Sequence, residues 1–149
     1  MIIRKMNQND ADEVFKMMRE FYDSPAVFHT SSDSVLKKDI EDCISENPFV
    51  EGFVFEEQGE LLGYAMTAPS YTTEYGGVCI WVEDLFFKPD HRHKGLGSLF
   101  FSYLEQQYPH AVRFKLEVEQ ENKHAIDAYR KKGYDFSPYF EMTKEMTQG

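Results

Sequence analysis

Apolar residues at helical spacing dominate the first third of the chain. After a short N-terminal strand, Asn9 can cap a helix. The apolar positions of this helix lie three or four residues apart and are Ala11, Val14, Phe15, Met18, Phe21 and Tyr22. A second stripe, preceded by capping residues at 31–34 and followed by Pro48, consists of Leu36, Ile40, Cys43 and Ile44. The two stripes predict two helices that each bury one face.

The middle of the chain has the composition of strands and turns. Segments 49–56, 61–71 and 78–87 are rich in β-branched and aromatic residues, and glycine-containing turns at 58–59 and 74–77 separate them. This order predicts an antiparallel meander.

Helical and strand periods alternate in the second half. A helical stripe runs from residue 96 to 104, and the alternation at 112–118 predicts a strand with one buried face. Asn122 opens a further predicted helix, which Gly133 closes as a left-handed cap. The aromatic remainder, 134–142, predicts one or two terminal strands. The pattern as a whole predicts a mixed α+β sheet protein.

Size and charge narrow the class of partner. The 149 residues contain no repeat or linker, which predicts a single domain, 1–149. The formal net charge of −10 opposes binding to nucleic acid or an anionic membrane. It suits a cationic partner, and it is equally an ordinary means of staying soluble. Cys43 and Cys79 have no disulfide or metal-ligand spacing, and no apolar run approaches the ~20 residues of a membrane span, so we expect a cytoplasmic protein with reduced cysteines.

The candidate chemistry lies where the third meander strand meets the next helix. This segment reads Arg92-His93-Lys94-Gly95-Leu96-Gly97-Ser98. Free N–H groups at a helix N-terminus attract anions, glycine lets a phosphate approach the main chain, and Arg92 and Lys94 add positive charge. The segment therefore has the outline of a pyrophosphate cradle. It lacks the Gly-Lys-Ser/Thr ending of a P-loop, and Phe100 replaces the third glycine of the dinucleotide fingerprint.

Two motifs together resemble the GNAT superfamily of N-acetyltransferases. One is Arg92-x-x-Gly95-x-Gly97 after an acidic and apolar strand, and the other is Asn122-x-x-Ala125-x-x-x-Tyr129 followed by Gly133-Tyr134. The resemblance extends over nearly the whole chain. It implies an acyl-CoA N-acyltransferase fold, in which helices flank a central, mixed and mostly antiparallel sheet. It also implies acetyl-CoA as the acetyl donor.

The resemblance implies where acetyl-CoA would bind. Main-chain amides of 92–98 would hold the pyrophosphate, and 85–87 would run beside the pantetheine like an added strand. This strand and the strand 112–118 would splay apart to admit the thioester. The implied cofactor residues are Leu85, Phe86, Phe87, Arg92, His93, Lys94, Gly95, Leu96, Gly97, Ser98, Asn122, Ala125 and Tyr129.

One residue departs from the family pattern. Many members have glycine in place of His93, so one close approach of an amide to phosphate is in doubt, although an imidazole can itself donate to phosphate. His91 and His93 have no third ligand at a suitable spacing, and no metal site is predicted.

Acetylation requires an amine that has lost its proton, because alkyl ammonium groups titrate near ~10. Glu83 stands among apolar residues that would raise its pKa, and the resemblance supports a glutamate base on this strand. Glu83 is therefore predicted to be the base, or else an anchor for the substrate cation. Because neighbours on a strand face opposite sides, Asp84 is predicted to be structural. A main-chain N–H near Leu85 or Phe86 would stabilise the oxyanion, and by analogy Tyr129 would protonate the leaving thiolate.

The acceptor side is expected to involve the first two helices, their loop and the later strands. The candidate substrate residues are Tyr22, Phe28, Glu74, Tyr75, Glu83 and Glu117. Aromatic and acidic groups suit an organic cation, and the run 83–87 with Arg92 and Ser98 resembles the diamine and polyamine branch of the family.

These residues imply direct acetyl transfer to a small primary amine such as a polyamine. A protein N-terminus or lysine as acceptor, and a non-catalytic acyl-CoA sensor, remain alternatives. The resemblance also suggests a homodimer formed through the aromatic terminus around Tyr139 and Phe140.

Overall fold

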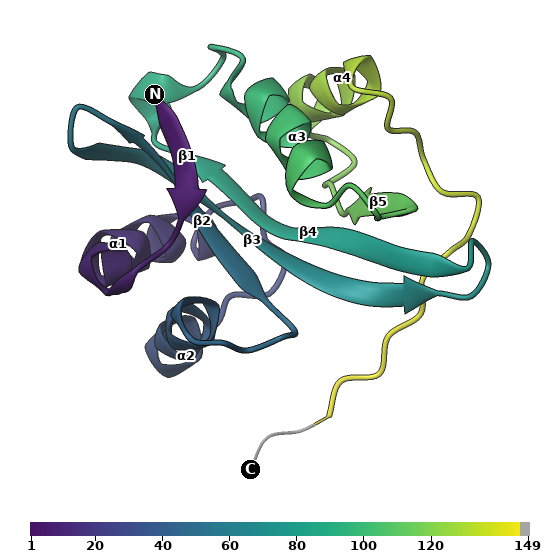
Figure 1. The fold of residues 1–149 in the computed structure, drawn as a ribbon, viewed down its shortest axis with the longest axis horizontal. Coiled ribbons are helices and arrows are strands. Elements are labelled where there is room, and N and C mark those ends of the chain that lie inside the picture. Colours follow the sequence, from purple (N-terminus) through teal and green to yellow (C-terminus); the bar gives the residue numbers. More distant parts are fainter. Residues whose placement is uncertain (147–149) are drawn as a thin grey trace.

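A five-stranded sheet forms the centre of the protein in a computed structural model that describes residues 1–146 (Figure 1). The strands are β1 (Ile2–Lys5), β2 (Glu51–Glu57), β3 (Glu60–Thr72), β4 (Gly77–Phe87) and β5 (Arg113–Leu116), and they lie in this order across the sheet. Neighbours are antiparallel except for β4 and β5, which are parallel. The predicted mixed and mostly antiparallel sheet is thus confirmed.

Two pairs of helices cover the two faces of the sheet (Figure 1). One pair is α1 (Ala11–Tyr22) and α2 (Asp33–Ile44), and the other is α3 (Leu96–Gln107) and α4 (Lys123–Lys131). Core residues without solvent exposure on the α1 and α2 side include Val14, Met18, Leu36, Val54 and Tyr64. Those on the α3 side include Phe53, Phe55, Ala65, Phe100 and Leu104. No helix within residues 1–146 has both the length and the apolar character that a membrane crossing requires.

The N-terminal cap of the first helix lies two residues earlier than predicted. The side-chain oxygen of Asn7 accepts a hydrogen bond from the Asn9 N–H at 2.9 Å, and the Asp10 carboxylate accepts one from the Asn7 N–H at 2.8 Å. This reciprocal capping box begins a short 3₁₀ turn, Gln8–Asp10, which leads into α1. Asn9 is therefore inside the turn rather than its cap.

The strand predicted at 112–118 is shorter, and it has no fully buried face. β5 covers only Arg113–Leu116, and all four residues are half-buried. The cationic side chains cover aromatic rings. The Arg113 guanidinium carbon lies 4.8 Å from the centre of the Tyr75 ring, and the Lys115 Nζ lies 5.0 Å from the centre of the Trp81 ring. The alternation of polar and apolar residues therefore did not translate into one buried and one exposed face.

The terminal strands predicted after Gly133 are absent from residues 134–146. Local bonds use the backbone donors instead, because the Phe136 N–H donates to its neighbour Asp135 at 2.8 Å and the Tyr139 N–H to Ser137 at 3.2 Å. Such local bonds compete with a sheet ladder, and Pro138 has no N–H to offer one. The Phe140 side chain is fully exposed.

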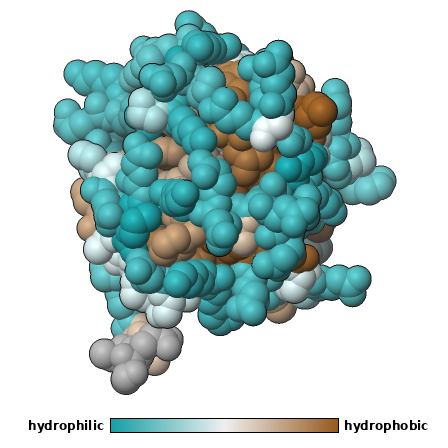
Figure 2. Space-filling view, turned by 90° about the vertical axis from the view of Figure 1, so that its left-hand side faces the viewer, coloured by the Kyte–Doolittle hydropathy of each residue, from teal (hydrophilic) through white to brown (hydrophobic). Residues whose placement is uncertain are grey.

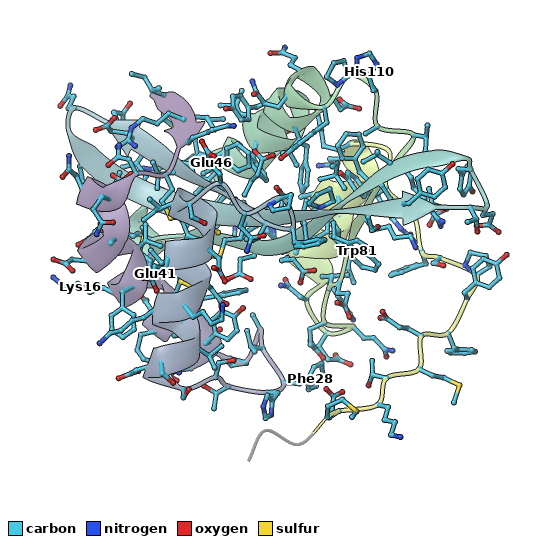
Figure 3. The ribbon with its side chains drawn as sticks, turned by 60° about the horizontal axis from the view of Figure 1, so that its bottom comes forward. Lys16, Phe28, Glu41, Glu46, Trp81 and His110 are labelled. Atoms are coloured by element: carbon cyan, nitrogen blue, oxygen red, sulfur yellow. The ribbon has the colours of Figure 1, made fainter. Side chains whose placement is uncertain are left out.

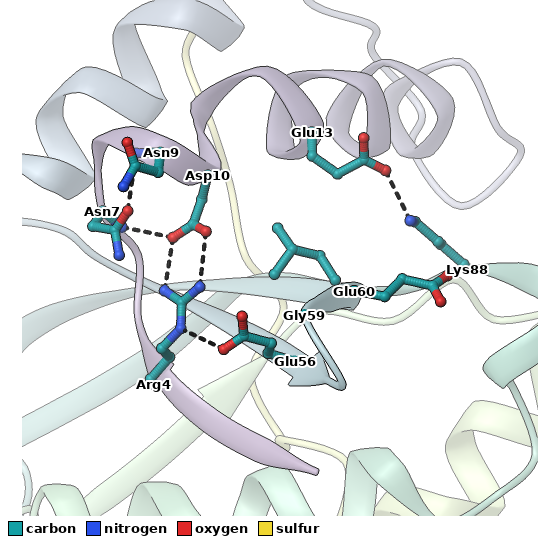
Figure 4. A pocket seen from close by; sticks show the side chains of 10 residues that line it. Arg4, Asn7, Asn9, Asp10, Glu13, Glu56, Gly59, Glu60 and Lys88 are labelled. Atoms are coloured by element: carbon teal, nitrogen blue, oxygen red, sulfur yellow. Dashed lines mark hydrogen bonds and ion pairs between the residues drawn. The ribbon is translucent and has the colours of Figure 1, made fainter.

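A polar hollow of about 630 Å³ lies between β1, the start of α1 and the β2–β3 hairpin (Figure 4). Arg4 donates to Asp10 at 2.8 and 2.9 Å and to Glu56 at 3.0 Å, while Lys88 pairs with Glu13 at 2.8 Å. The face of the molecule at this side is mainly hydrophilic (Figure 2). The bonds of Arg4 join β1 to the start of α1 and to β2, so most charges of the hollow are paired with one another.

Candidate active site

A β-bulge lies at the centre of the candidate site. Met66 of β3 stands opposite Asp84 and Thr67 stands opposite Val82, so Glu83 has no partner on β3. An extra residue of this kind breaks the alternation of side chains between the two faces. The bulge therefore removes the strict alternation on which the prediction for the two carboxylates rested. Glu83 is exposed and Asp84 is buried, and which of them faces the substrate stays a prediction.

β4 and β5 separate immediately at this bulge. Their parallel ladder runs from Cys79 opposite Arg113 to Val82 opposite Leu116, where β5 ends. Beyond that point, no strand within residues 1–146 pairs with this edge of β4 over 83–87, which we call the open edge of β4. Apart from the Phe87 carbonyl, which accepts from Arg92, the outward main-chain groups of this edge have no strand partner and are available to another extended partner. The splay implied by the family resemblance is present, and the bulge explains it because bulges bend and twist a strand.

The loop after β4 folds back onto the end of that strand. The Arg92 Nε donates to the Phe87 carbonyl oxygen at 2.8 Å, and the guanidinium lies 5.2 Å from the centre of the Phe86 ring. Phe86 itself turns its side chain to the α1 face, where it packs against Phe21 and Tyr64. Arg92 thus contacts the end of β4, and Phe86 offers the open edge only its main chain.

The start of α3 presents the donors that an anion needs. Gly95 is left-handed, with φ of 78°, and α3 starts at Leu96. The N–H groups of the first helical turn therefore have no partner earlier in the helix. A Cβ atom on Gly97 would have only the Phe87 ring as a neighbour, 4.0 Å away, so packing does not require glycine there. Lys94 and Ser98 are exposed on the same turn.

Helix α4 lies beside this loop. Asn122 caps it by accepting from the Ala125 N–H at 3.3 Å, and His124 in its first turn is hydrogen-bonded to His93 of the loop. The two sequence motifs therefore meet in space. Tyr129 packs edge-on against an aromatic ring of α3, with 5.5 Å between ring centres.

The environment of Tyr129 keeps its proton on the oxygen at neutral pH. Burial of the ring raises the pKa of Tyr129. The hydroxyl makes no hydrogen bond within residues 1–146, yet no unsatisfied polar side-chain atom of those residues is sealed from solvent. The hydroxyl therefore reaches open space and is able to donate to an incoming group.

Asp84 is the most buried carboxylate of the site. Its side chain lies in the core, the residue is 3% exposed, and Tyr22 and Tyr64 donate their hydroxyls to its two oxygens at 3.0 and 2.8 Å. Desolvation raises the pKa of Asp84 to about 6, although both tyrosine hydrogen bonds act in the opposite direction. The predicted structural role is consistent with this contact, which joins α1 to β3 and β4. Its charge is nevertheless part of the site.

Three further acids lie around Glu83. They are Asp39 of α2, Glu117 just beyond β5 and Glu141 of the C-terminal segment. Although the Glu83 side chain reaches solvent, desolvation and then the charge of Glu141 raise its pKa. Desolvation is also the main cause of the raised pKa values of Asp39 and Glu117, and the charge of Glu83 adds to both.

We call these five acids the cleft carboxylates: Asp39, Glu83, Asp84, Glu117 and Glu141. None of them forms an ion pair with a lysine or arginine of residues 1–146. Negative charges held together without a cation are costly, and a bound cation would relieve that cost.

Two predicted substrate residues lie in the β3–β4 turn, away from Glu83. Glu74 accepts from Arg113 at 3.3 Å and from the Tyr139 hydroxyl at 2.7 Å, while Tyr75 stacks on Arg113. The start of β4 is six residues before Glu83, which corresponds to roughly 20 Å along a strand. The structure does not bring Glu74 or Tyr75 to Glu83, and their contact with substrate stays a prediction.

Phe28 lies on the side of the molecule along which the C-terminal segment runs. It stands in the loop between α1 and α2 and is 90% exposed (Figure 3). A ring so exposed contributes little to the packing of this loop. Its predicted contact with substrate also remains a prediction.

Four residues of the site were not predicted. Asp39 adjoins the buried stripe of α2, and a charge beside an apolar face was a usable signal. Tyr64 reaches Asp84 through strand register, which periodicity does not reveal. Glu141 lies in the segment predicted as strand, and the contact of His124 depends on the left-handed conformation of the loop before α3.

The comparisons with known proteins agree with this geometry. The sequence model of the Acetyltransferase (GNAT) family matches residues 12–134. The thialysine N-epsilon-acetyltransferase of Sus scrofa is 29% identical over 144 residues, which cover 89% of this chain and 82% of the relative. The spermine/spermidine N(1)-acetyltransferase of Bacillus subtilis (strain 168) is 27% identical over 114 residues, covering 73% of this chain and 72% of the relative. A solved structure of a possible acetyltransferase from Clostridium difficile 630 has a TM-score of 0.83 at 18% identity, over 99% of this chain and 98% of that chain, which establishes the likeness in fold.

Proposed function

We propose that this chain, which belongs to the acetyltransferase (GNAT) family, transfers the acetyl group directly to a small polyamine bound among the cleft carboxylates. GNAT enzymes use acetyl-CoA, and the chain is an acetyl-CoA-dependent N-acetyltransferase that acts on amines. The identity of the amine, the site residues and the direct transfer are the proposed part. The observation that carries the proposal is that Glu83, at the bulge where the open edge of β4 begins, interacts through its charge with Asp39, Asp84, Glu117 and Glu141, and that none of these acids pairs with a lysine or arginine of residues 1–146.

The open edge and the adjoining loop fit the donor. The unpaired main chain of 83–87 would hold the pantetheine as a neighbouring strand, and the free N–H groups at the start of α3 would hold the pyrophosphate. Bound in this way, acetyl-CoA supplies the acetyl group next to the bulge. Lys94 is exposed on the same turn and would add positive charge.

The spread of the carboxylates favours a polyamine over a monoamine. Asp39 comes from α2, Glu83 from the bulge of β4, and Glu117 and Glu141 from beyond β5. Acids on several elements can engage more than one ammonium group of an extended cation. The relatives named for spermine, spermidine and thialysine support an amine of this kind.

Glu83 is proposed as the base and Tyr129 as the acid. The raised pKa of Glu83 makes it a stronger proton acceptor, and its place in the bulge sets it where the open edge begins. It would take a proton from the substrate ammonium, directly or through a water. The Tyr129 hydroxyl would give its proton to the departing thiolate. The second proton lost by the attacking nitrogen would return to the tyrosinate, directly or through water, and Glu83 would release the first proton to solvent.

The cysteines support transfer without an acyl-enzyme. Desolvation raises the pKa of Cys43 to about 12, and it also raises the pKa of Cys79. Both thiols are buried, so neither provides the thiolate that attack on a thioester needs.

The proposal is tested by release of free thiol from acetyl-CoA in the presence of spermidine, spermine, thialysine, aminoglycosides and peptides. We expect the polyamines to give the highest kcat/KM. Asp39→Asn should raise KM for spermidine, with Glu41→Gln on the exposed face of α2 as the matched control. A preference for a peptide or aminoglycoside would contradict the polyamine assignment. If none of the amines causes thiol release, the non-catalytic sensor would remain.

A further inference from the structure

Two histidines join the loop before α3 to the first turn of α4. The Nδ1 atom of His93 and the Nε2 atom of His124 are 2.6 Å apart, which is hydrogen-bond distance. The rings are nearly perpendicular, at 88°, with centres 4.1 Å apart. Both side chains are exposed, so no apolar packing forces the contact.

The backbone at His93 is unfavourable for a residue with a side chain. His93 has φ of 62°, in the left-handed region, which is strained for a residue other than glycine. The structure places an imidazole where glycine is the less strained choice, and that imidazole makes one side-chain bond within residues 1–146, to His124. Residues in strained backbone conformations are often found at functional sites, so the contact of His93 with His124 is a candidate functional contact.

The pair lies at the proposed cofactor site. His93 belongs to the turn that would hold the pyrophosphate, and His124 stands two residues after Asn122, the cap of α4. The loop before α3 and the start of α4 are thus joined by this contact. We propose that His93 and His124 form a proton-operated clasp over the pyrophosphate, and that both imidazoles donate to it once coenzyme A binds. This inference rests on the proposed position of the cofactor.

The number of protons decides the state of the clasp. In the hydrogen-bonded pair one nitrogen donates and the other accepts, so the two facing atoms share a single proton. The accepting nitrogen has no hydrogen to offer a phosphate oxygen. The accepting ring has its N–H on the other nitrogen, which points away from its partner. For both facing nitrogens to donate to the phosphates, the pair must take up one proton from solvent, which breaks the N–H···N bond. In the proposed clasp, cofactor binding is therefore coupled to proton uptake.

The surrounding charges are mixed. The loop before α3 contributes Asp90, His91, Arg92 and Lys94, and the first turns of α4 contribute Lys123 and Asp127. Neither imidazole forms an ion pair with a carboxylate of residues 1–146. The second proton is therefore stabilised mainly by the phosphates. Because imidazoles change charge between about pH 5 and 8, the dissociation constant of coenzyme A should rise by up to ~10-fold per pH unit in the upper part of that range.

Calorimetry in buffers of different ionisation enthalpy measures the proton uptake directly. Dephospho-coenzyme A is the ligand, because the 3′-phosphate of coenzyme A itself titrates near ~6. At pH 7.5 the unmodified chain should take up a large part of one proton. His93→Gly, which suits the left-handed backbone, and His124→Gln should each abolish the uptake and weaken binding. His110→Gln, at an exposed histidine between α3 and β5, should change neither value.

The outcomes separate the clasp from the cofactor site. Binding without proton uptake, or equal uptake in His124→Gln, would overturn the clasp while leaving the site in place. No binding by the unmodified chain would overturn the cofactor site and the clasp together. Acetyl-pantetheine, which has no pyrophosphate, should bind without proton uptake, and uptake with this ligand would also contradict the clasp.

Discussion

Asp84→Asn should make the fold more stable at neutral pH. Burial raises the pKa of Asp84 from its ordinary value of 3.8 to about 6. A carboxyl group of this kind stabilises the folded chain while protonated, and the contribution is lost as pH rises through the folded-state pKa. A shift of this size corresponds to ~3 kcal/mol at ~1.4 kcal/mol per pH unit. Asparagine has nearly the same shape, remains neutral, and can bond to the hydroxyls of Tyr22 and Tyr64.

Urea unfolding of both proteins between pH 4 and pH 7.5, followed by Trp81 fluorescence, measures this effect. The free energies of unfolding of the two proteins should be similar near pH 4. Above pH 7, the free energy of unfolding of the unmodified chain should be lower than that of the variant by ~3 kcal/mol. Spermidine should bind more weakly to the variant, because one of the cleft carboxylates has lost its charge. A stability difference that stays constant with pH would refute the reasoning, since it would mean that Asp84 is not a destabilising buried charge.

Three further substitutions test the catalytic and cofactor assignments. Tyr129→Phe should lower kcat by ~100-fold or more and leave coenzyme A affinity within about twofold. An unchanged kcat in steady-state assays would show that Tyr129 is not the general acid. Glu83→Gln should slow the reaction at pH 7, and the deficit in a pH–rate profile should shrink toward the amine pKa near ~10; a constant deficit would make Glu83 an anchor. Gly97→Ala should leave the melting temperature unchanged or raise it, because alanine favours a helix, while coenzyme A affinity falls by ~10-fold in calorimetry; undiminished affinity would place the phosphates elsewhere.

Much of the fold could be predicted from periodicity and composition. The stripe that begins at Ala11 identified α1, because this helix buries one face. Composition and glycine turns identified β2 to β4, whose central residues, such as 52–55 of β2 and 61–67 of β3, are buried on both faces and so show no alternation. The C-terminal segment was predicted wrongly. Its aromatic residues have the composition of a strand, but local bonds to Asp135 and Ser137 occupy two of its backbone donors, and Pro138 has none to offer.

The candidate site was predictable only in part. The motif residues Arg92 and Asn122 lie near the open edge and α4 as expected, because short motifs report local loop and helix geometry. The bulge at Glu83 depends on how β3 and β4 align. The sequence of one strand does not specify its register with the neighbouring strand. The grouping of Glu83 with Asp39 and Glu141 follows from that bulge and from the path of the C-terminal segment, so sequence spacing could not provide it.

Amide hydrogen exchange with and without coenzyme A tests the proposed cofactor site most directly. If the open edge of β4 and the start of α3 bind the pantetheine and pyrophosphate, peptides covering 83–98 should exchange more slowly in the complex. Peptides from β1 and the β2–β3 hairpin, around the polar hollow, should be unchanged. Protection confined to that hollow, or no added protection of 83–98 at saturating coenzyme A, would contradict the proposed site.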